Sequence, residues 1–156
     1  LNVVYCGDGR NNVAKSLMII SAKLGINCTI ISPKKLFPDE SLVTICKNLG
    51  EKSGSKIIIS DSLSLVKGAD CIYTDVWISM GEESLREERL SLLKPYQVNS
   101  KLMEMTENPN CIFLHCLPAV KDEEVTTEVI EGSQSKVWDQ AENRKHTIKA
   151  IMLATI

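Results

Sequence analysis

The feature that most constrains this sequence is a regular alternation of short apolar segments with longer segments of helical spacing. Five segments have the length and the near-continuous apolar character of buried strands, at residues 2–6, 27–32, 56–60, 71–77 and 111–117. Strands of this kind that alternate with helices are typical of a parallel sheet covered on both faces. We therefore predict an α/β fold: a three-layer, doubly wound parallel sheet, Rossmann-like, in a single domain over residues 1–156.

The expected helices follow from the spacing of apolar residues and from the glycine and proline residues that bound them. They are expected at 11–24, from 38 onward, and at 62–67, 82–93, 100–107 and 123–130, the last as a helix or turn. Residues 136–138 are expected as a short edge strand. A final helix is expected from about Ala141 to the end of the chain, with Ile148, Ile151 and Met152 facing inward.

Composition places the chain among ordinary globular proteins. Its 156 residues suit one domain with a real core, 44% of them are apolar, and the net charge is −2. A nucleic-acid partner would require a basic face, and a membrane span would require about 18 consecutive apolar residues. The sequence shows neither feature, so we expect no nucleic-acid partner and no membrane span. The first residues already resemble a core strand and no signal peptide precedes them, so we expect a piece of a longer protein.

The six cysteines do not resemble a disulfide framework or a metal site. Five of them lie in or beside expected strands and helices, and none has metal-ligand spacing. We interpret these five as free thiols in a reducing compartment, which predicts a cytoplasmic protein without a metal. The sixth, Cys116, ends a strand, and ligands of parallel sheets bind at strand ends.

The turn after the first strand reads Cys6-Gly7-Asp8-Gly9-Arg10-Asn11-Asn12. A dinucleotide fingerprint would place a glycine at position 12 and an acidic residue after the second strand, and both are missing. A tight turn with an asparagine cap on the next helix explains the pattern better. The turn still lies at the edge of the sheet where ligands bind.

Two further strand ends carry polar residues. Asp75 stands near the end of the fourth strand, before a loop that contains Ser79 and Met80, and a carboxylate there could pair with a ligand cation. A helix cap is the alternative for this stretch. The fifth strand ends in His115-Cys116-Leu117-Pro118, where buried filler and site residue both remain open for Cys116.

Arg144 is expected in the first turn of the last helix. A guanidinium combined with the positive end of a helix would suit a phosphate or another oxyanion. A solvated helix start is the alternative.

Four motifs together resemble the second half of the ornithine carbamoyltransferases: GDGRNN, DVWISMG, HCLP and AENRKHTIKA, in this order and spacing. The likeness covers essentially the whole chain and includes KPYQVN at 94–99. The pair SMG and HCLP is specific, because aspartate carbamoyltransferases carry other residues before their LP. Relatives that act on putrescine or acetylated ornithine differ in the SMG loop.

The resemblance implies that carbamoyl phosphate and L-ornithine give L-citrulline and phosphate, without a metal or an organic cofactor. It implies two α/β domains, of which residues 1–156 are the ornithine-binding one, and a homotrimer or a multiple of trimers. The metabolism is that of arginine, in biosynthesis, in the urea cycle or in degradation.

The resemblance also assigns the ornithine-binding residues. Asn12 matches the asparagine that holds the α-carboxylate of ornithine. Asp75 matches the aspartate that binds its α-amino group. Ser79 and Met80 match the loop that closes over the substrate.

The remaining roles concern the reacting groups. Cys116, as a thiol or a thiolate, matches the cysteine that orients the δ-amine and helps it lose a proton. The backbone of Cys116 and Leu117 would face the carbamoyl group of carbamoyl phosphate. Arg144 matches the arginine that polarises the carbamoyl oxygen. Cys116, Asp75 and Arg144 are thus the expected catalytic residues.

The carbamoyl-phosphate motif Ser-x-Arg-Thr and the His-Pro-x-Gln stretch of the family's first domain do not occur in these 156 residues. We therefore expect little or no turnover from the chain alone. Two alternatives stay open: a carbamoyltransferase for a related amine, and a non-catalytic Rossmann-like binding module.

Overall fold

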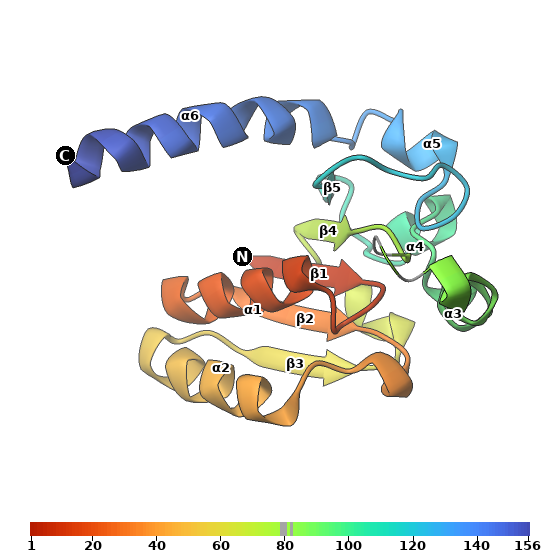
Figure 1. Ribbon diagram of the computed structural model, residues 1–156, viewed down its shortest axis with the longest axis horizontal. Helices are drawn as coiled ribbons and strands as arrows, with labels where there is room; N and C mark the ends of the chain where they lie inside the picture. Colours follow the sequence, from red (N-terminus) through yellow and green to blue (C-terminus); the bar gives the residue numbers. More distant parts are fainter. Residues whose placement is uncertain (79–80, 82) are drawn as a thin grey trace.

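The computed structural model describes residues 1–78, 81 and 83–156 of the chain. Within them, one parallel sheet runs in the order β3-β2-β1-β4-β5 (Figure 1). Its strands are β1 (Asn2–Cys6), β2 (Asn27–Ile31), β3 (Ile57–Ser60), β4 (Cys71–Thr74) and β5 (Ile112–His115). The chain adds β2 and β3 on one side of β1 and then crosses over to add β4 and β5 on the other. The predicted α/β fold is confirmed, and the strand order reverses between β1 and β4.

Helices pack against both faces of this sheet. They are α1 (Asn12–Leu24), α2 (Glu40–Ser53), α3 (Arg86–Leu93), α4 (Ser100–Glu104), α5 (Thr127–Ile130) and α6 (Val137–Thr155), with the 3-10 turns η1 (Lys34–Leu36), η2 (Leu63–Val66), η3 (Glu83–Leu85) and η4 (Lys94–Tyr96). α1 and α2 lie together over one face (Figure 1). The other face is covered by η2, α4, α5 and Val137, the first residue of α6.

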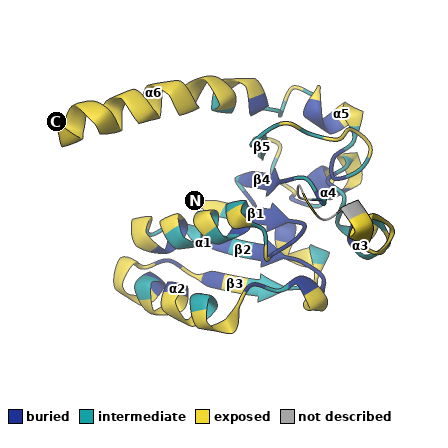
Figure 2. Ribbon diagram, in the orientation of Figure 1, coloured by how far each residue is buried: buried dark blue, intermediate teal, exposed yellow. Residues whose placement is uncertain are grey.

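Alternation along the strands assigns each side chain to one of two cores. Val4, Ile72 and Phe113 point to the face covered by α4 and α5. Tyr5 and Tyr73 point to the face covered by α1 and α2. β4 is buried in both directions, whereas the edge strand β3 is partly exposed (Figure 2). Burial on both faces explains why strands such as β4 are apolar without strict alternation.

β4 and β5 are shorter than the sequence predicts. The expected strands 71–77 and 111–117 end in the structure at Thr74 and His115. Their last expected residues leave the ladder and form loops at the carboxyl edge. Asp75 and Cys116 therefore lie just beyond the strands, where their side chains can serve a site.

The prediction was wrong at the start of the last helix. The expected strand 136–138 is only an isolated bridge between Ser135 and Phe113, and α6 already begins at Val137. Val137 is fully buried as the first residue of the helix, so its β-branched side chain serves the core without a strand. None of the helices described is long and apolar enough to span a membrane.

The second part of α6 was also predicted incorrectly. Ile148, Ile151 and Met152 were expected to face inward, but they are 48%, 62% and 56% exposed. Every residue from 141 to 156 is exposed, and Figure 2 shows α6 as exposed over most of its length and separate from the rest of the ribbon. No described part of the chain packs on this stretch, so the apolar spacing has no core to enter.

Candidate active site at the carboxyl edge of the sheet

The carboxyl ends of β1, β4 and β5 meet at one edge of the sheet. Tyr5 pairs with Tyr73, and Thr74 pairs with His115. The residues that follow these pairs therefore continue as neighbouring turns. Ligands of open parallel sheets bind where the strand order reverses, here between β1 and β4.

Asp75 and Cys116 form the polar centre of this edge. The Oδ1 atom of Asp75 accepts a hydrogen bond from the Val76 N–H at 2.8 Å and one from the Cys116 Sγ–H at 3.0 Å. Asp75 is buried, and Cys116 is half-buried. The structure thus brings together two of the predicted catalytic residues.

The environment of Cys116 decides its protonation. Burial, followed by the hydrogen bond to Asp75 and the charge of that carboxylate, raises the pKa of the Cys116 thiol to about 12. At neutral pH the sulfur therefore keeps its proton and donates it to Asp75. Of the two forms that the sequence left open, the structure favours the thiol.

Two tyrosines that the sequence analysis did not identify line the face below this pair. The rings of Tyr5 and Tyr73 stack with their centroids 6.3 Å apart. Burial and, after it, the charge of Asp75 raise the pKa of Tyr5 well above its usual value, so its hydroxyl is neutral. That hydroxyl is buried and has no hydrogen-bond partner among the described residues. Each tyrosine is the next-to-last residue of its strand, and this shared position was the available signal.

The turn after β1 requires its glycines. Gly7 has φ of +140°, which side-chain-bearing residues rarely adopt. A Cβ on Gly9 would lie 2.8 Å from the Leu36 carbonyl oxygen. The turn then enters α1 through Asn11, whose side chain accepts a hydrogen bond from the Val13 N–H at 2.7 Å. The predicted tight turn with an asparagine cap is confirmed, with Asn11 as the cap.

Asn12 is the first residue of α1 and is exposed. Its side chain makes no hydrogen bond to any residue that the structure describes, so its amide is available to a ligand. It follows the turn that leads from β1 into α1, which puts it at the edge that carries Asp75.

A buried ion pair that the sequence analysis did not identify connects the β1 turn to α3. Asp8 and Arg89 are 8% and 7% exposed, and the Arg89 guanidinium contacts the Asp8 carboxylate directly. The other carboxylate oxygen of Asp8 accepts a hydrogen bond from the Arg10 N–H at 2.9 Å. The pair spans 81 positions in sequence, so no local pattern could indicate it.

Arg144 lines a cavity of about 650 Å³ between α6 and the sheet, together with Tyr73, Cys116 and Gln140. It is exposed and forms no ion pair with the described residues, so its guanidinium is open to a ligand. It is the eighth residue of α6, two turns from the helix start. The expected help from the helix dipole, which acts within the first turn, therefore does not apply.

The two predicted loop residues Ser79 and Met80 lie outside the described residues. Leu117 is described and half-buried, with φ of +56°. Its N–H donates a hydrogen bond to Nδ1 of His115 at 2.9 Å.

Side chains that could hold a metal ion occur at this edge. The ligand atoms of Asp75, His115 and Cys116 all lie within 4.8 Å of one another. Both ring nitrogens of His115 are already engaged, Nδ1 by Leu117 and Nε2 by the Glu124 carboxylate at 3.2 Å. A metal ion could bind His115 only by breaking one of these bonds, so the geometry favours the hydrogen-bonded arrangement.

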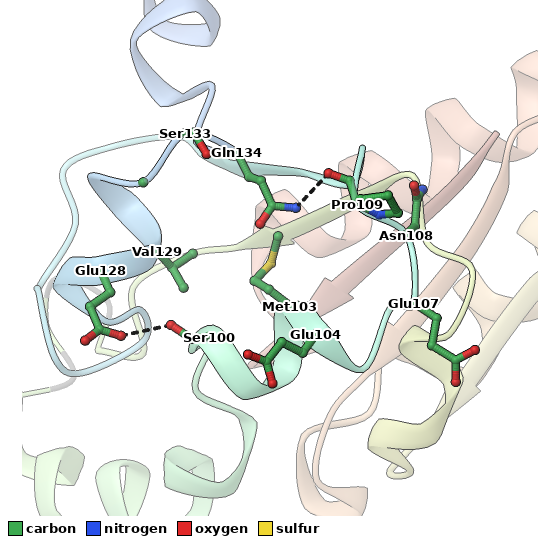
Figure 3. Close-up of a pocket in the computed structure, with 11 residues that line it drawn as sticks. Ser100, Met103, Glu104, Glu107, Asn108, Pro109, Glu128, Val129, Ser133 and Gln134 are labelled. Carbon is green, nitrogen blue, oxygen red and sulfur yellow. Dashed lines mark hydrogen bonds between the residues drawn. The ribbon is translucent and has the colours of Figure 1, made fainter.

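Another cavity, of about 680 Å³, lies between α4, α5 and the segment that leads into β5 (Figure 3). Two of its carboxylates are engaged locally: Glu128 accepts a hydrogen bond from Ser100, and Glu107 pairs with Lys67. It opens beside the amino end of β5, at the opposite end of that strand from Cys116. The candidate active site is therefore formed by the polar side chains at the carboxyl edge.

Known proteins resemble this chain over its whole length. The chain is 58% identical to an ornithine carbamoyltransferase of Pseudothermotoga lettingae and 55% identical to one of Thermotoga maritima, over its whole length in both cases. It covers 50% of each of these proteins, so the chain spans about half the length of the curated relatives it matches.

Solved structures give the same result. An ornithine carbamoyltransferase from Pyrococcus furiosus superimposes with a TM-score of 0.91 at 46% identity, over 97% of this chain and 48% of that one. An anabolic ornithine carbamoyltransferase from Campylobacter jejuni reaches the same score at 30% identity, over 97% of this chain and 50% of that one. Residues 1–155 match the sequence model of the family described as aspartate/ornithine carbamoyltransferase, Asp/Orn binding domain. The chain therefore belongs to the aspartate/ornithine carbamoyltransferase family.

Proposed function

We propose that this chain, over residues 1–156, is the ornithine-binding domain of an ornithine carbamoyltransferase. The observation that carries the proposal is the buried Asp75–Cys116 hydrogen bond, which stands at the carboxyl edge beside the strand-order reversal. Support comes from relatives of that name that match the whole chain at 51–58% identity.

Ornithine offers a carboxylate, an ammonium group and a reactive amine. Asp75 supplies a buried negative charge for the α-ammonium group, and the free amide of Asn12 can donate to the α-carboxylate. Ser79 and Met80 would close over the bound substrate. These residues follow β1 and β4, so the two ends of the zwitterion are held across the strand-order reversal.

In the reaction, the δ-amine nitrogen of ornithine bonds to the carbamoyl carbon, the bond from that carbon to the phosphate oxygen breaks, and the nitrogen gives up a proton to the departing phosphate. Cys116 is a thiol, so it orients the amine without taking that proton. The Cys116–Leu117 backbone faces the carbamoyl group. The guanidinium of Arg144 stabilises the negative charge that develops on the carbamoyl oxygen.

A separate domain would supply the carbamoyl-phosphate site, because the chain carries neither of the two motifs expected for it. We expect the two-domain protein to be a cytoplasmic homotrimer or a multiple of trimers that needs no cofactor. Its six free cysteines suit a reducing compartment. Relatives act in both directions by name, catabolic in Streptococcus ratti and anabolic in Campylobacter jejuni.

The first test is the intact mass of the protein in its source, followed by a citrulline assay. A mass of about twice the 17.3 kDa of this chain and citrulline formation from L-ornithine and carbamoyl phosphate are expected. Asp75→Asn should lower kcat/KM for ornithine by about 100-fold, because a neutral amide cannot pair with the ammonium group.

The same assay separates the alternatives. Faster turnover of putrescine or acetylated ornithine would indicate a carbamoyltransferase for a related amine. A mass of 17.3 kDa without turnover would contradict the proposal and favour a binding module.

A further inference from the structure

We infer that His115 and Glu124, a buried pair behind the turn after β5, are positioning residues that hold the Cys116–Leu117 backbone against the carbamoyl group. The inference rests on the proposed function and adds two residues to it. Neither residue contacts the substrate, and both act through the turn.

The pair lies next to the thiol. Cys116 packs against the core beneath α1, and a ring nitrogen of His115 lies within 4.8 Å of its sulfur. His115 is 1% exposed and Glu124 is fully buried. The two side chains meet at 3.2 Å between Nε2 of His115 and Oε1 of Glu124.

The hydrogen bonds determine which nitrogen of His115 carries the proton. The Leu117 backbone N–H can only donate, so Nδ1, at 2.9 Å, accepts and carries no proton. The proton of the neutral ring is then on Nε2, where it is donated to Glu124.

Glu124 holds the other end of the same turn. Its Oε1 atom also accepts a hydrogen bond from the Val120 N–H at 2.7 Å. The Glu124 backbone is itself anchored, since its carbonyl accepts from the Val98 N–H at 2.9 Å. One buried pair thus ties down the backbone at both ends of residues 117–120.

Leu117 is where such support is needed. Its φ of +56° is in the left-handed region, which is unfavourable for a residue with a side chain. A conformation of this kind persists when the surroundings hold it, and such residues cluster at functional sites. The side chain of the adjacent Cys116 is itself held by its hydrogen bond to Asp75.

His115 is also linked to the element that carries Arg144. Its backbone N–H donates to Oε1 of Gln140 at 3.1 Å, and Nε2 of Gln140 donates to the Tyr73 hydroxyl at 2.7 Å. Gln140 precedes Arg144 by one turn of α6. The residue that supports the turn is therefore bonded, through one side chain, to the helix of the predicted catalytic arginine.

A purely structural role would not require these groups. Apolar side chains of similar volume fill a core as well as a buried polar pair or better. Oε2 of Glu124 has no partner in the described chain, so the pair leaves one buried acceptor unsatisfied. The directed bonds to two backbone N–H groups are what an apolar pair could not provide.

Two isosteric substitutions separate the functions of the ring. In His115→Asn the side-chain oxygen takes the place of Nδ1 and keeps the Leu117 bond, while the contact to Glu124 is lost. In His115→Gln the terminal amide takes the place of Nε2 and keeps the Glu124 bond, while Leu117 loses its acceptor. Each variant removes one buried hydrogen bond, so their losses of stability should be similar.

The variants are compared in the complete citrulline-forming enzyme. His115→Gln should lower kcat by about 100-fold, and His115→Asn by less than about tenfold, with KM for ornithine changing less than threefold in both. Thr106→Val is the control, because it removes buried hydrogen bonds far from the turn. The Thr106 hydroxyl donates to the Met103 carbonyl at 2.7 Å and accepts from the Asn108 N–H at 3.2 Å. This control variant should lower the melting temperature and leave kcat unchanged.

Equal loss of kcat in the two His115 variants, or a loss that simply follows the melting temperature in all three, would overturn the inference. A wild-type enzyme that forms no citrulline would instead contradict the proposed function. Nitrogen-15 NMR of His115 in the wild-type chain gives a readout independent of turnover. A proton on Nε2 alone is expected, and a proton on Nδ1 would also overturn the inference.

Discussion

Two turns meet at the candidate site, and they are stabilised in different ways. The turn after β1 depends on Gly7 and Gly9, on the Asn11 cap and on the ion pair of Asp8 with Arg89. The turn after β5 contains no glycine. It keeps Leu117 at a positive φ by means of the buried pair His115 and Glu124.

The difference shows that a turn can be stabilised mainly by its own residues or mainly by residues elsewhere in the fold. A glycine adopts an unusual φ by itself, so a glycine-rich turn is largely determined by its own residues. A leucine does so at a cost and needs bonds from elsewhere in the fold. The β1 turn can therefore be recognised in the sequence, whereas the support of the β5 turn becomes visible only in three dimensions.

The largest expected effect concerns the thiol of the β5 turn. With a pKa of about 12, Cys116 should react with iodoacetamide at pH 8 about 1000-fold more slowly than a thiol of pKa near 9, because only the thiolate reacts. The rate should keep rising with pH for as long as the chain stays folded. Alkylation followed by mass spectrometry measures it.

Asp75→Asn is the matched control for that experiment. Removal of the carboxylate charge should lower the pKa of Cys116 and speed its alkylation, whereas burial alone should still keep the reaction slow. A wild-type rate that levels off by pH 10 would be incompatible with a thiol held protonated by Asp75.

The next effect tests the distant support of the β1 turn. Arg89→Met should lower the free energy of unfolding by about 3 kcal/mol, because it leaves the buried Asp8 carboxylate without its main partner. Denaturant unfolding measures the change. Arg89→Lys keeps the charge and should cost less, and a loss below about 1 kcal/mol for Arg89→Met would mean that the β1 turn needs no distant support.

A smaller effect tests the glycines. Gly9→Ala should lower the free energy of unfolding by about 2 kcal/mol, since its Cβ would meet the Leu36 carbonyl oxygen at 2.8 Å. Gly54→Ala is the comparison, because Gly54 has φ of +84° with no neighbour within 4 Å, and only the backbone cost of about 1 kcal/mol applies. Equal losses of unfolding free energy in the two variants would show that neighbouring atoms move away from the new Cβ at position 9.

The smallest effect separates two neighbouring asparagines. Asn11→Ala should cost about 1 kcal/mol of unfolding free energy, because it removes the cap of α1. Asn12→Ala should change that quantity by less than about 0.5 kcal/mol, since the exposed Asn12 bonds to no described residue. In the complete enzyme, Asn12→Ala should raise KM for ornithine and Asn11→Ala should not, and the reverse pattern would exchange their roles.

Much of the fold was predictable because parallel strands buried on both faces leave an apolar signal that needs no tertiary information. The start of α6 was not predictable, because Val137 has the character of a strand residue and is placed in a helix by the core that receives it. Ile151 was expected to face inward, and this prediction was wrong because no described part of the chain packs against it.

The candidate site likewise has features that the sequence predicts and features that it does not. Asp75 and Cys116 could be found because both follow apolar strands, and chains of this class bind ligands there. Their 3.0 Å contact, the neutral thiol and the tyrosines beneath them depend on the register between β1, β4 and β5. Register is a property of the assembled sheet, so it could not be derived from any one segment.

The sequence by itself determined the sheet, the two glycines of the first turn, the asparagine cap and the polar residues at three strand ends, because each depends on residues close together in the chain. The tertiary structure alone decided the Asp8–Arg89 pair, the His115–Glu124 support and the protonation of Cys116. Each of these depends on burial and on contacts between separate elements, and burial exists only once the chain has folded.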